Sequence, residues 1–196
     1  MQASAIVLAG GKSTRMRTNK ALLEIDREQM IEVVVKKLKP IFHDLLVVTN
    51  EPDLYSNLGV RLVRDIILGQ SPLCGMHAGL ISAKYEYSFV VACDMPFIEP
   101  SLIKYLVSES RGYDVVVPQI DDYLQPLHAV YSKKCIAPIQ DCLEHDIKKV
   151  LALYHQVRVK FIGMNRLPVQ ADLEKVFFNV NTPEDLKKAR DLVEIK

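Results

Sequence analysis

The sequence predicts an α/β fold, a single domain of three layers in which helices cover both faces of a mostly parallel central sheet. Short, fully apolar, β-branched segments recur along the chain, as expected of parallel strands buried on both faces. Helical patterns lie between these segments, and this alternation is typical of α/β proteins. The length of 196 residues suits one domain spanning residues 1–196.

Four apolar segments predict the inner strands of the sheet. They are residues 5–8 (AIVL), 45–49 (LLVVT), 89–92 (FVVA) and 115–117 (VVV). A shorter strand is expected to end at residues 63–65. The residues that follow these strands matter for function, because ligands of open α/β sheets bind beyond the carboxyl ends of the strands.

Helical spacing is clear after residue 30. Met30, Val33, Val34, Lys37 and Leu38 recur at i, i+3, i+4, i+7 and i+8. This spacing places the apolar positions on one face of a helix.

Capping signals predict the start of two further helices. Glu99 and Pro100 precede a helical pattern of apolar residues. Near the end of the chain, Thr182 is placed to cap a helix with Pro183 at its first position, where the missing N–H of proline costs nothing. We expect this last helix to continue through residues 187–193.

The charge balance excludes several classes of partner. The chain carries 25 Lys and Arg against 24 Asp and Glu, a formal net charge of +1, which provides no strongly basic field for a nucleic acid. No apolar stretch approaches the roughly 20 residues of a membrane span. The charge is nevertheless uneven, basic in residues 1–40 and acidic in residues 80–125, as the binding of a polyphosphate with its metal would require.

The cysteines indicate a reducing compartment. Cys74, Cys93, Cys135 and Cys142 form no C-x-x-C pair, and their spacing matches neither a zinc site nor a small disulfide scaffold. No secretory signal pattern opens the chain. We therefore expect a cytoplasmic protein that contacts neither nucleic acid nor a membrane.

The most informative segment is residues 8–20 (LAGGKSTRMRTNK), which directly follows the first predicted strand. Its glycines let main-chain N–H groups turn toward an anion, and its cations would neutralise phosphate charge. The common mononucleotide motifs do not fit, because a P-loop needs glycine where Ile6 stands and G-x-G-x-x-G is absent. The segment indicates phosphate binding; the alternative is an exposed, flexible turn.

Residues 8–20 resemble the signature L-A-G-G-x-S-x-R-M-G-x-D-K of nucleotidyltransferases that activate small phosphorylated molecules, the molybdenum cofactor guanylyltransferases in particular. The resemblance implies a Rossmann-like fold of the nucleotide-diphospho-sugar transferase type. It also implies catalytic roles for Arg15 and Lys20, which would stabilise charge on the phosphates. Lys20 and the start of the loop would bind the nucleotide, through the main chain of Leu8, Ala9, Gly10 and Gly11.

The loop departs from that signature at two positions. Arg17 stands in place of a glycine, which bears on how closely the main chain approaches phosphate. Asn19 stands in place of an aspartate and removes a carboxylate near Lys20. These departures favour one alternative, a nucleotide-binding regulatory protein whose catalytic loop has decayed.

A second motif is residues 93–97 (CDMPF), which places Asp94 just beyond a buried strand. A hard cation such as Mg²⁺ takes oxygen ligands, often one or two carboxylates together with substrate phosphates. The alternative from chemistry alone is that Asp94 caps a turn before Pro96. The motif is similar to the metal-binding segment of the same family, which implies that Asp94 is a catalytic residue, binds Mg²⁺ and contacts the nucleotide.

Three residues between these motifs are further nucleotide-binding candidates. Asn50 and Asp65 follow two predicted strands, where the family has contacts to base or ribose; simple strand-end turns are the alternative. Residues 71–80 (SPLCGMHAGL) resemble the family's G-P-L-x-G loop, in which small residues let the base lie against the main chain. Gly75 is the candidate there, although it could equally be a helix-start residue without ligand contact.

The acceptor side is expected in the last third of the chain. Residues 125–131 (QPLHAVY) resemble the P-L-x-A-x-Y segment beside the acceptor site, and His128 could orient the acceptor phosphate or be a packing histidine. Residues 177–185 (FFNVNTPED) resemble the N-x-N-T-P-E-D motif. Asn179 and Asn181 are therefore acceptor-binding candidates.

The resemblance implies an enzyme that transfers GMP from GTP to the terminal phosphate of the molybdenum–molybdopterin cofactor, releasing pyrophosphate. Mg²⁺ is the implied cofactor, and cofactor-biosynthesis or acceptor enzymes are implied as transient partners. A cytidylyl- or sugar-phosphate nucleotidyltransferase remains an alternative, because the first loop and C-D-M-P recur among relatives that use other bases and acceptors.

Overall fold

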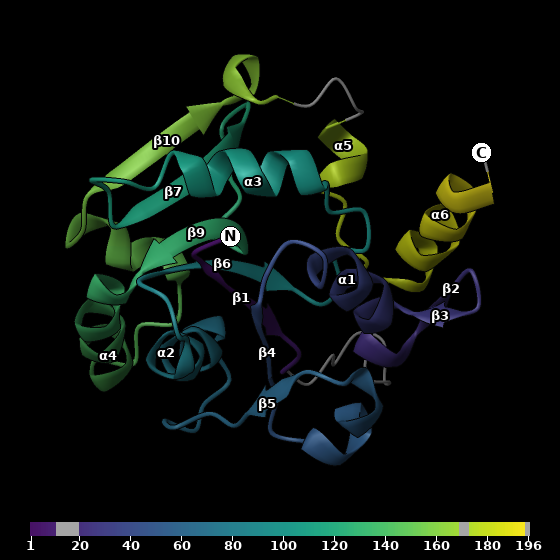
Figure 1. The fold of residues 1–196 in the computed structure, drawn as a ribbon, viewed down its shortest axis with the longest axis horizontal. Helices are drawn as coiled ribbons and strands as arrows, with labels where there is room; N and C mark the ends of the chain where they lie inside the picture. The colour runs from purple at the N-terminus through teal and green to yellow at the C-terminus, as the bar shows by residue number, and fades with distance from the viewer. Residues whose placement is uncertain (11–19, 169–172, 195–196) are drawn as a thin grey trace.

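The computed structural model describes residues 1–10, 20–168 and 173–194. Its middle layer is an eight-stranded sheet with the order β10-β7-β9-β6-β1-β4-β5, and β8 pairs with β7 (Figure 1). The strands are β1 Ser4–Leu8, β4 Asp44–Val48, β5 Arg61–Val63, β6 Tyr87–Ala92, β7 Val115–Ile120, β8 Tyr123–Leu124, β9 His128–Ser132 and β10 Val159–Gly163. β1 lies between the parallel strands β4 and β6, whereas β9 runs antiparallel to both of its neighbours, β6 and β7. The four apolar segments singled out in the sequence lie in β1, β4, β6 and β7, and the predicted mostly parallel sheet is confirmed.

Helices cover both faces of the sheet. The α-helices are α1 Met30–Leu38, α2 Pro72–Ser82, α3 Pro100–Ser108, α4 Ile136–Glu144, α5 Leu173–Val176 and α6 Pro183–Glu194. Short 3-10 helices are η1 Lys20–Leu22, η2 Pro52–Leu58, η3 Lys133–Cys135, η4 Val150–His155 and η5 Met164–Arg166. In the described parts of the chain, every helix is too short or too polar to cross a membrane.

The inner strands send alternate side chains into two separate cores, because successive residues of a strand point to opposite faces. Ala5 and Val7 of β1 join the core under α1 and α3. Ile6 and Leu8 join the core under α2 and α4. Both faces of the strand are therefore buried, which accounts for its unbroken apolar sequence.

Helix α1 forms where predicted, but its buried face is rotated from the predicted one. The fully buried positions are Met30, Ile31, Val34, Val35 and Leu38. Val33 and Lys37, which the spacing placed on the same face, are only half-buried and border a second cavity of about 270 Å³. The spacing therefore marked three of the buried positions, Met30, Val34 and Leu38, and missed Ile31 and Val35.

Both predicted helix starts are confirmed. The Glu99 carboxylate accepts a hydrogen bond from Ser101 N, with Pro100 as the first residue of α3. At the start of α6, Thr182 Oγ1 accepts from Asp185 N at 3.1 Å, and Asp185 Oδ2 accepts from Thr182 N at 2.9 Å. This reciprocal arrangement satisfies N–H groups that an uncapped helix would leave unpaired.

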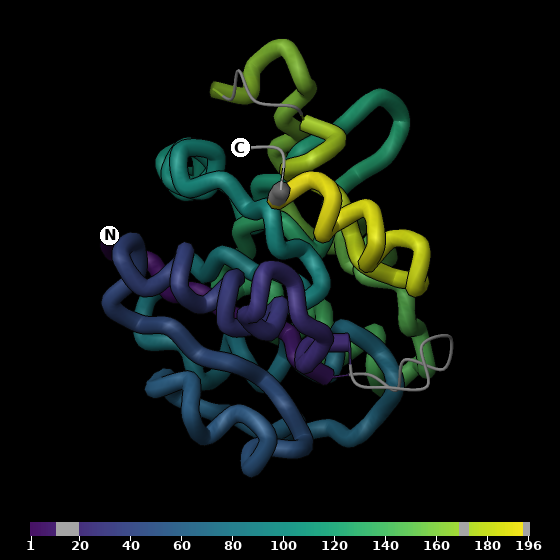
Figure 2. The backbone as a smooth tube through the Cα atoms, turned by 90° about the vertical axis from the view of Figure 1, so that its right-hand side faces the viewer, coloured from purple at the N-terminus to yellow at the C-terminus, as the bar shows by residue number. Residues whose placement is uncertain are grey.

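Helix α6 lies outside the three layers, beside a small hairpin of β2 Glu24–Ile25 and β3 Glu28–Gln29 (Figure 1). In Figure 2, α6 is yellow and lies on the same side of the molecule as the purple segment that follows residue 20. Ile25, Met30, Val180, Leu186 and Ala189 form a separate apolar cluster there. The end of the chain is therefore attached next to the end of the first loop.

Candidate active site

A crevice of about 290 Å³ opens at the carboxyl edge of the sheet. β1 lies centrally there, with β4 on one side and β6 on the other, so the chain order reverses beside it, as at the ligand sites of other open α/β sheets. The described residues that line it come mostly from strand ends and the loops after them: Leu8, Ala9, Gly10, Lys20, Ala21, Val48, Asn50, Asp65, Gly69, Gln70, Ser71, Pro72, Gly75, Ala92, Cys93, Asp94 and Leu127.

Most of the sequence-predicted nucleotide site lies on this wall. The structure brings together Leu8, Ala9, Gly10, Lys20, Asn50, Asp65, Gly75 and Asp94. Gly11 and Arg15 lie outside the described residues. The eight described candidates come from positions 8 to 94 of the chain, so only the parallel sheet brings them to one edge.

Asp94 follows β6 and is held through its main chain. Cys93 N donates to Leu8 O at 3.1 Å, and Val180 N donates to Asp94 O at 2.9 Å. The carboxylate itself is less well paired: among the residues that the structure describes, Oδ1 is buried without a hydrogen-bond partner, and Oδ2 lies 3.7 Å from Lys20 Nζ. Burial raises the pKa of the Asp94 carboxyl above its ordinary value, and Lys20 opposes that shift.

Lys20 joins the end of the first loop to the C-terminal segment. Its Nζ donates a hydrogen bond of 2.6 Å to Asn181 Oδ1 while it faces Asp94. The Lys20 side chain is 18% exposed and that of Asp94 is 19% exposed, so the pair is only weakly screened by water. This triad is the centre of the site and unites segments from both ends and the middle of the chain.

The oxygen atoms around Asp94 fit a hard divalent cation. The buried, unpaired Oδ1 is a ligand atom of the kind Mg²⁺ prefers, and the Asn181 side chain supplies a second oxygen close by. Within the described residues, no three His, Cys, Asp or Glu side chains gather into a metal-binding cluster. A cation here would therefore take most of its ligands from substrate phosphates and water.

Asn50 and Asp65 form a reciprocal pair at the rim of the crevice. Asn50 Nδ2 donates to Asp65 Oδ2 at 2.8 Å, and Asp65 N donates to Asn50 Oδ1 at 3.2 Å. The pair bridges the ends of β4 and β5. It presents carboxylate and amide groups to the crevice that could read the edge of a base or a ribose.

The start of α2 forms the wall beside this pair. Ser71 Oγ accepts from Leu73 N at 3.2 Å and donates to Lys148 O at 2.9 Å, so it caps α2 where the family signature has glycine. Gly75 lies in the first turns of α2, where a Cβ would lie 3.0 Å from Leu8 Cδ2 and 3.7 Å from Asp65 Oδ1. The absent side chain leaves the crevice open on this side.

The structure places His128 in the core, away from the crevice wall. Its ring packs edge-on against Phe89 and Phe177, with centroids 5.1 and 4.9 Å away, and neither ring nitrogen has a hydrogen-bond partner within residues 1–10, 20–168 and 173–194. Burial lowers the pKa of His128 to about 3, so the ring is neutral. Leu127 lines the crevice instead; it lies in the turn before β9, which the bond from His128 N to Gln125 O closes at 3.0 Å.

The two asparagines differ in their position. Asn181 reaches the site through its bond to Lys20. Asn179 Nδ2 donates to Phe177 O at 3.1 Å, and Asn179 does not line the crevice. Only Asn181 of the three acceptor-binding candidates is therefore placed at the site by a direct contact.

Sequence reasoning did not single out several residues of the wall. These are Gly69, Gln70, Pro72 and Ala21, and only their position next to predicted residues could have indicated them. Cys93 also lines the crevice, but burial, aided by the charge of Asp94, raises the pKa of its thiol. It is therefore a neutral thiol and not a nucleophile.

The mostly parallel sheet has a carboxyl-edge crevice that holds a lysine opposite a buried carboxylate, an arrangement suited to a phosphorylated ligand. The profile of the family described as "MobA-like NTP transferase domain" matches residues 5–159. The chain belongs to this family, among its molybdenum cofactor guanylyltransferases, as the resemblance of the first loop and the C-D-M-P-F segment predicted.

Individual relatives cover almost the whole chain. The "Probable molybdenum cofactor guanylyltransferase" of Pelotomaculum thermopropionicum is 47% identical over 194 residues, which are 99% of this chain and 95% of the relative. The "Molybdenum cofactor guanylyltransferase" of Desulfosudis oleivorans is 38% identical, over 95% of this chain and 93% of the relative.

The solved structures agree. The crystal structure of molybdopterin-guanine dinucleotide biosynthesis protein A from Archaeoglobus fulgidus superposes with a TM-score of 0.86 at 26% identity, covering 98% of this chain and 100% of that one. A 4-diphosphocytidyl-2C-methyl-D-erythritol synthase from Anaerococcus prevotii has a TM-score of 0.73 at 14% identity, covering 98% of each chain, and shows the fold alone.

Proposed function

We propose that this protein transfers the GMP group of GTP to the terminal phosphate of the molybdenum–molybdopterin cofactor, forming the guanine dinucleotide and pyrophosphate. The names of its full-length relatives support this activity. The observation that carries the proposal is the triad of Lys20, Asp94 and Asn181. It places the Lys20 ammonium group and an unpaired oxygen of the Asp94 carboxylate at the crevice. A cytidylyltransferase is not favoured, because its example matches in fold only.

The reaction needs positioning and charge neutralisation more than proton transfer. An oxygen of the acceptor phosphate attacks the α-phosphorus of GTP, the bond from that phosphorus to the oxygen bridging to the β-phosphate breaks, and pyrophosphate leaves with the electron pair. The acceptor phosphate is already anionic at neutral pH, so no general base has to remove a proton. A neutral, buried His128 is compatible with this chemistry.

Lys20 and Asp94 have complementary tasks in this proposal. The Lys20 ammonium stabilises negative charge on the phosphates, where it is only weakly screened by water. Asp94 holds Mg²⁺, which when bound neutralises phosphate charge. Gly10 and the preceding residues offer main-chain groups to the nucleotide. From the sequence motif, we extend this main-chain role to Gly11 and the charge-stabilising role of Lys20 to Arg15.

The Asn50–Asp65 pair is suited to guanine. The guanine edge carries N–H donors at N1 and N2, and a carboxylate accepts from two donors at once. Adenine and uracil present an acceptor within the corresponding edge, which the Asp65 carboxylate would repel. Asn181 contacts the acceptor phosphate in our proposal, and Asn179 supports that segment through its bond to Phe177.

We propose the cytoplasm as the place of action, with transient contact to cofactor-biosynthesis or acceptor enzymes. All four cysteines are free, and three of them are buried, which suits a reducing compartment.

The proposal is tested by pyrophosphate release with GTP, Mg²⁺ and molybdopterin cofactor. We expect Asp94→Asn to abolish pyrophosphate release while the variant still folds, since the neutral asparagine amide lacks the negative charge that binds Mg²⁺. Thermal stabilisation by GTP, CTP, UTP and ATP gives the base preference, because a preferred ligand raises stability by mass action. GTP should stabilise most. Preference for CTP would support a cytidylyltransferase, and binding without release would indicate a regulatory protein.

A further inference from the structure

Lys37 makes an unusual connection between α1 and the loop that carries Asp94. Its Nζ donates hydrogen bonds to Pro96 O at 3.1 Å and to Ile98 O at 3.2 Å. Both carbonyls belong to the turn between β6 and α3, two and four residues after Asp94. One ammonium group from a different element therefore ties both sides of this turn.

A lysine next to the apolar face of α1 is unfavourable for folding unless its ammonium group finds hydrogen-bond partners. The buried face of α1 is apolar, with Ile31, Val34 and Leu38 fully buried, and Lys37 next to it is half-buried. Moving an ammonium group toward such a face is unfavourable without hydrogen-bond partners. Lys37 meets that cost with charge-assisted bonds, which are roughly twice as strong as neutral ones, and its half-buried stem reaches the second cavity.

The remaining contacts of the turn explain why such a tie matters. Met95 and Ile98 are buried in the same apolar core as the inner face of α1. On the opposite side of the turn, Val180 N donates to Asp94 O. The main chain at Asp94 is therefore held by the C-terminal segment, by the core and by Lys37, while its carboxylate extends into the crevice with one oxygen unpaired.

We propose that Lys37 is a positioning residue that fixes the turn after β6 and thereby places the Asp94 carboxylate for cation binding. The inference rests on the proposed function for the role of Asp94, and it adds a residue outside the crevice to the site. Lys37 touches neither the nucleotide nor the cation. It acts through the main chain of residues 96–98.

The consequence follows from how steeply transfer reactions depend on geometry, because a misplacement of about 1 Å can cost on the order of 100-fold in rate. We expect Lys37→Met, which keeps the apolar stem and removes the donors, to weaken Mn²⁺ binding in the presence of GTP by about tenfold and to lower kcat with little change in the KM for GTP. Most of the crevice wall comes from other segments, so GTP binding itself should be retained.

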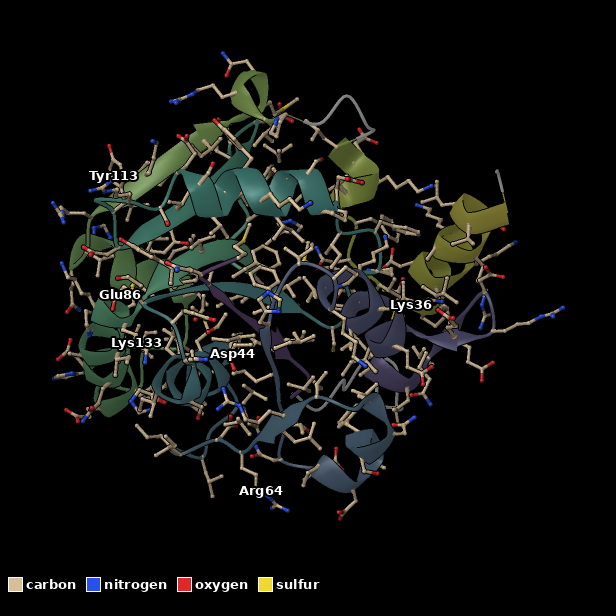
Figure 3. The ribbon with its side chains drawn as sticks, in the orientation of Figure 1. Lys36, Asp44, Arg64, Glu86, Tyr113 and Lys133 are labelled. Atoms are coloured by element: carbon tan, nitrogen blue, oxygen red, sulfur yellow. The ribbon has the colours of Figure 1, made fainter. Side chains whose placement is uncertain are left out.

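The decisive experiment combines direct Mn²⁺ titration with hydrogen exchange of the Val180 amide, neither of which requires turnover. In Lys37→Met that amide should exchange faster than in the natural protein, because the turn that supplies its acceptor is released. Lys36→Met is the matched control, since Lys36 is the neighbouring residue of α1 and its Nζ pairs with Glu28 of the hairpin at 2.7 Å. Figure 3 labels Lys36 on the side of α1 near the hairpin. The control should leave both measurements unchanged.

Lys37→Gln, which keeps a shorter neutral donor, is measured in parallel and should fall between the natural protein and Lys37→Met. If Lys37→Met does not fold, the same two measurements on Lys37→Gln decide the matter. Unchanged Mn²⁺ affinity and unchanged Val180 exchange in a folded variant would overturn the inference, even if thermal stability fell. If the natural protein binds Mn²⁺ with GTP but transfers no nucleotide, the proposed function fails while the positioning role is still decided.

Discussion

At the scale of single residues, Asp94 is suited to cation binding at the expense of folding stability. The carboxyl group is largely buried, one of its oxygens has no hydrogen-bond partner, and its compensation is a lysine 3.7 Å away. A carboxylate that is only partly compensated in this way is unfavourable for folding and favourable for holding a cation. Activity and stability therefore make opposite demands on this residue.

We expect Asp94→Asn to raise the melting temperature at neutral pH while it abolishes transfer. Burial raises the pKa of Asp94 in the folded protein, so the stability it contributes is present at low pH and is lost as the pH rises through the folded pKa. Each gain of 1 kcal/mol in the free energy of unfolding raises the melting temperature by about 2–4 °C for a protein of this size.

Melting curves of both proteins from acidic to neutral pH test this expectation. The difference between the variant and the natural protein should shrink at low pH, where the natural carboxyl is protonated. Asp122→Asn is a suitable control at an exposed carboxyl outside the crevice. A variant that is less stable than the natural protein at neutral pH would contradict the assignment of Asp94 as an unfavourably buried carboxylate.

At the scale of elements, the position of helix α2 is determined by its close approach to β1. A Cβ at Gly79 would lie 2.7 Å from Ile6 Cγ2 and 3.0 Å from Ile6 Cδ1, closer than side chains tolerate. One turn earlier on the same helix, Gly75 opens the crevice wall. The two glycines therefore connect packing of the core with the shape of the site.

Gly79→Ala should destabilise the protein by about 1–3 kcal/mol through overpacking, and it should weaken GTP binding because α2 has to move outward from β1. Urea denaturation and GTP titration measure the two effects. Ile81→Ala, at an exposed position of the same helix, is the control and should be close to neutral. A stable Gly79→Ala protein would mean that the contact with Ile6 relaxes without cost.

The start of α6 offers a second element that serves the site. Asp185 Oδ2 accepts from Asn181 N at 3.0 Å and from Thr182 N at 2.9 Å. Burial alone would raise the pKa of Asp185, but the bonds from Asn181 and Thr182 together lower it. The cap thus orients the same asparagine whose side chain binds Lys20.

Asp185→Ala should cost about 1 kcal/mol, the usual effect of a lost cap, and should also reduce transfer by releasing Asn181. Because the folded pKa is lowered, the stability that Asp185 contributes is present at neutral pH and is lost as the pH falls through that folded pKa. Asp191→Ala, at an exposed position of the same helix, is the control. The difference in melting temperature between Asp185→Ala and this control should therefore vanish in acid. A difference that persists there would indicate lost packing.

At the scale of the whole molecule, a net charge of +1 conceals a local opposition of charges. The cation at the end of the first loop and the carboxylate after β6 meet because β1 and β6 are parallel neighbours. The C-terminal segment adds Asn181 and Val180 to that point. The site is complete only when both ends of the chain are in place.

Much of the fold could be predicted because its signals are local. Apolar runs of four or five residues located the inner strands, and capping residues located the starts of α3 and α6. The error at Val33 and Lys37 arose because helical spacing reports a face but not which neighbours surround it. One of those neighbours is the turn after β6, which a pattern within α1 does not reveal.

The sequence by itself determined the fold class, the family and the residue types available for chemistry, because each depends on patterns within a few neighbouring residues. Only the tertiary structure decided which of them meet. Lys20 and Asn181 are separated by 161 positions and share a 2.6 Å hydrogen bond, whereas His128, one residue from the crevice wall, is buried between phenyl rings. Contacts of both kinds depend on the order and facing of strands, which no local pattern encodes.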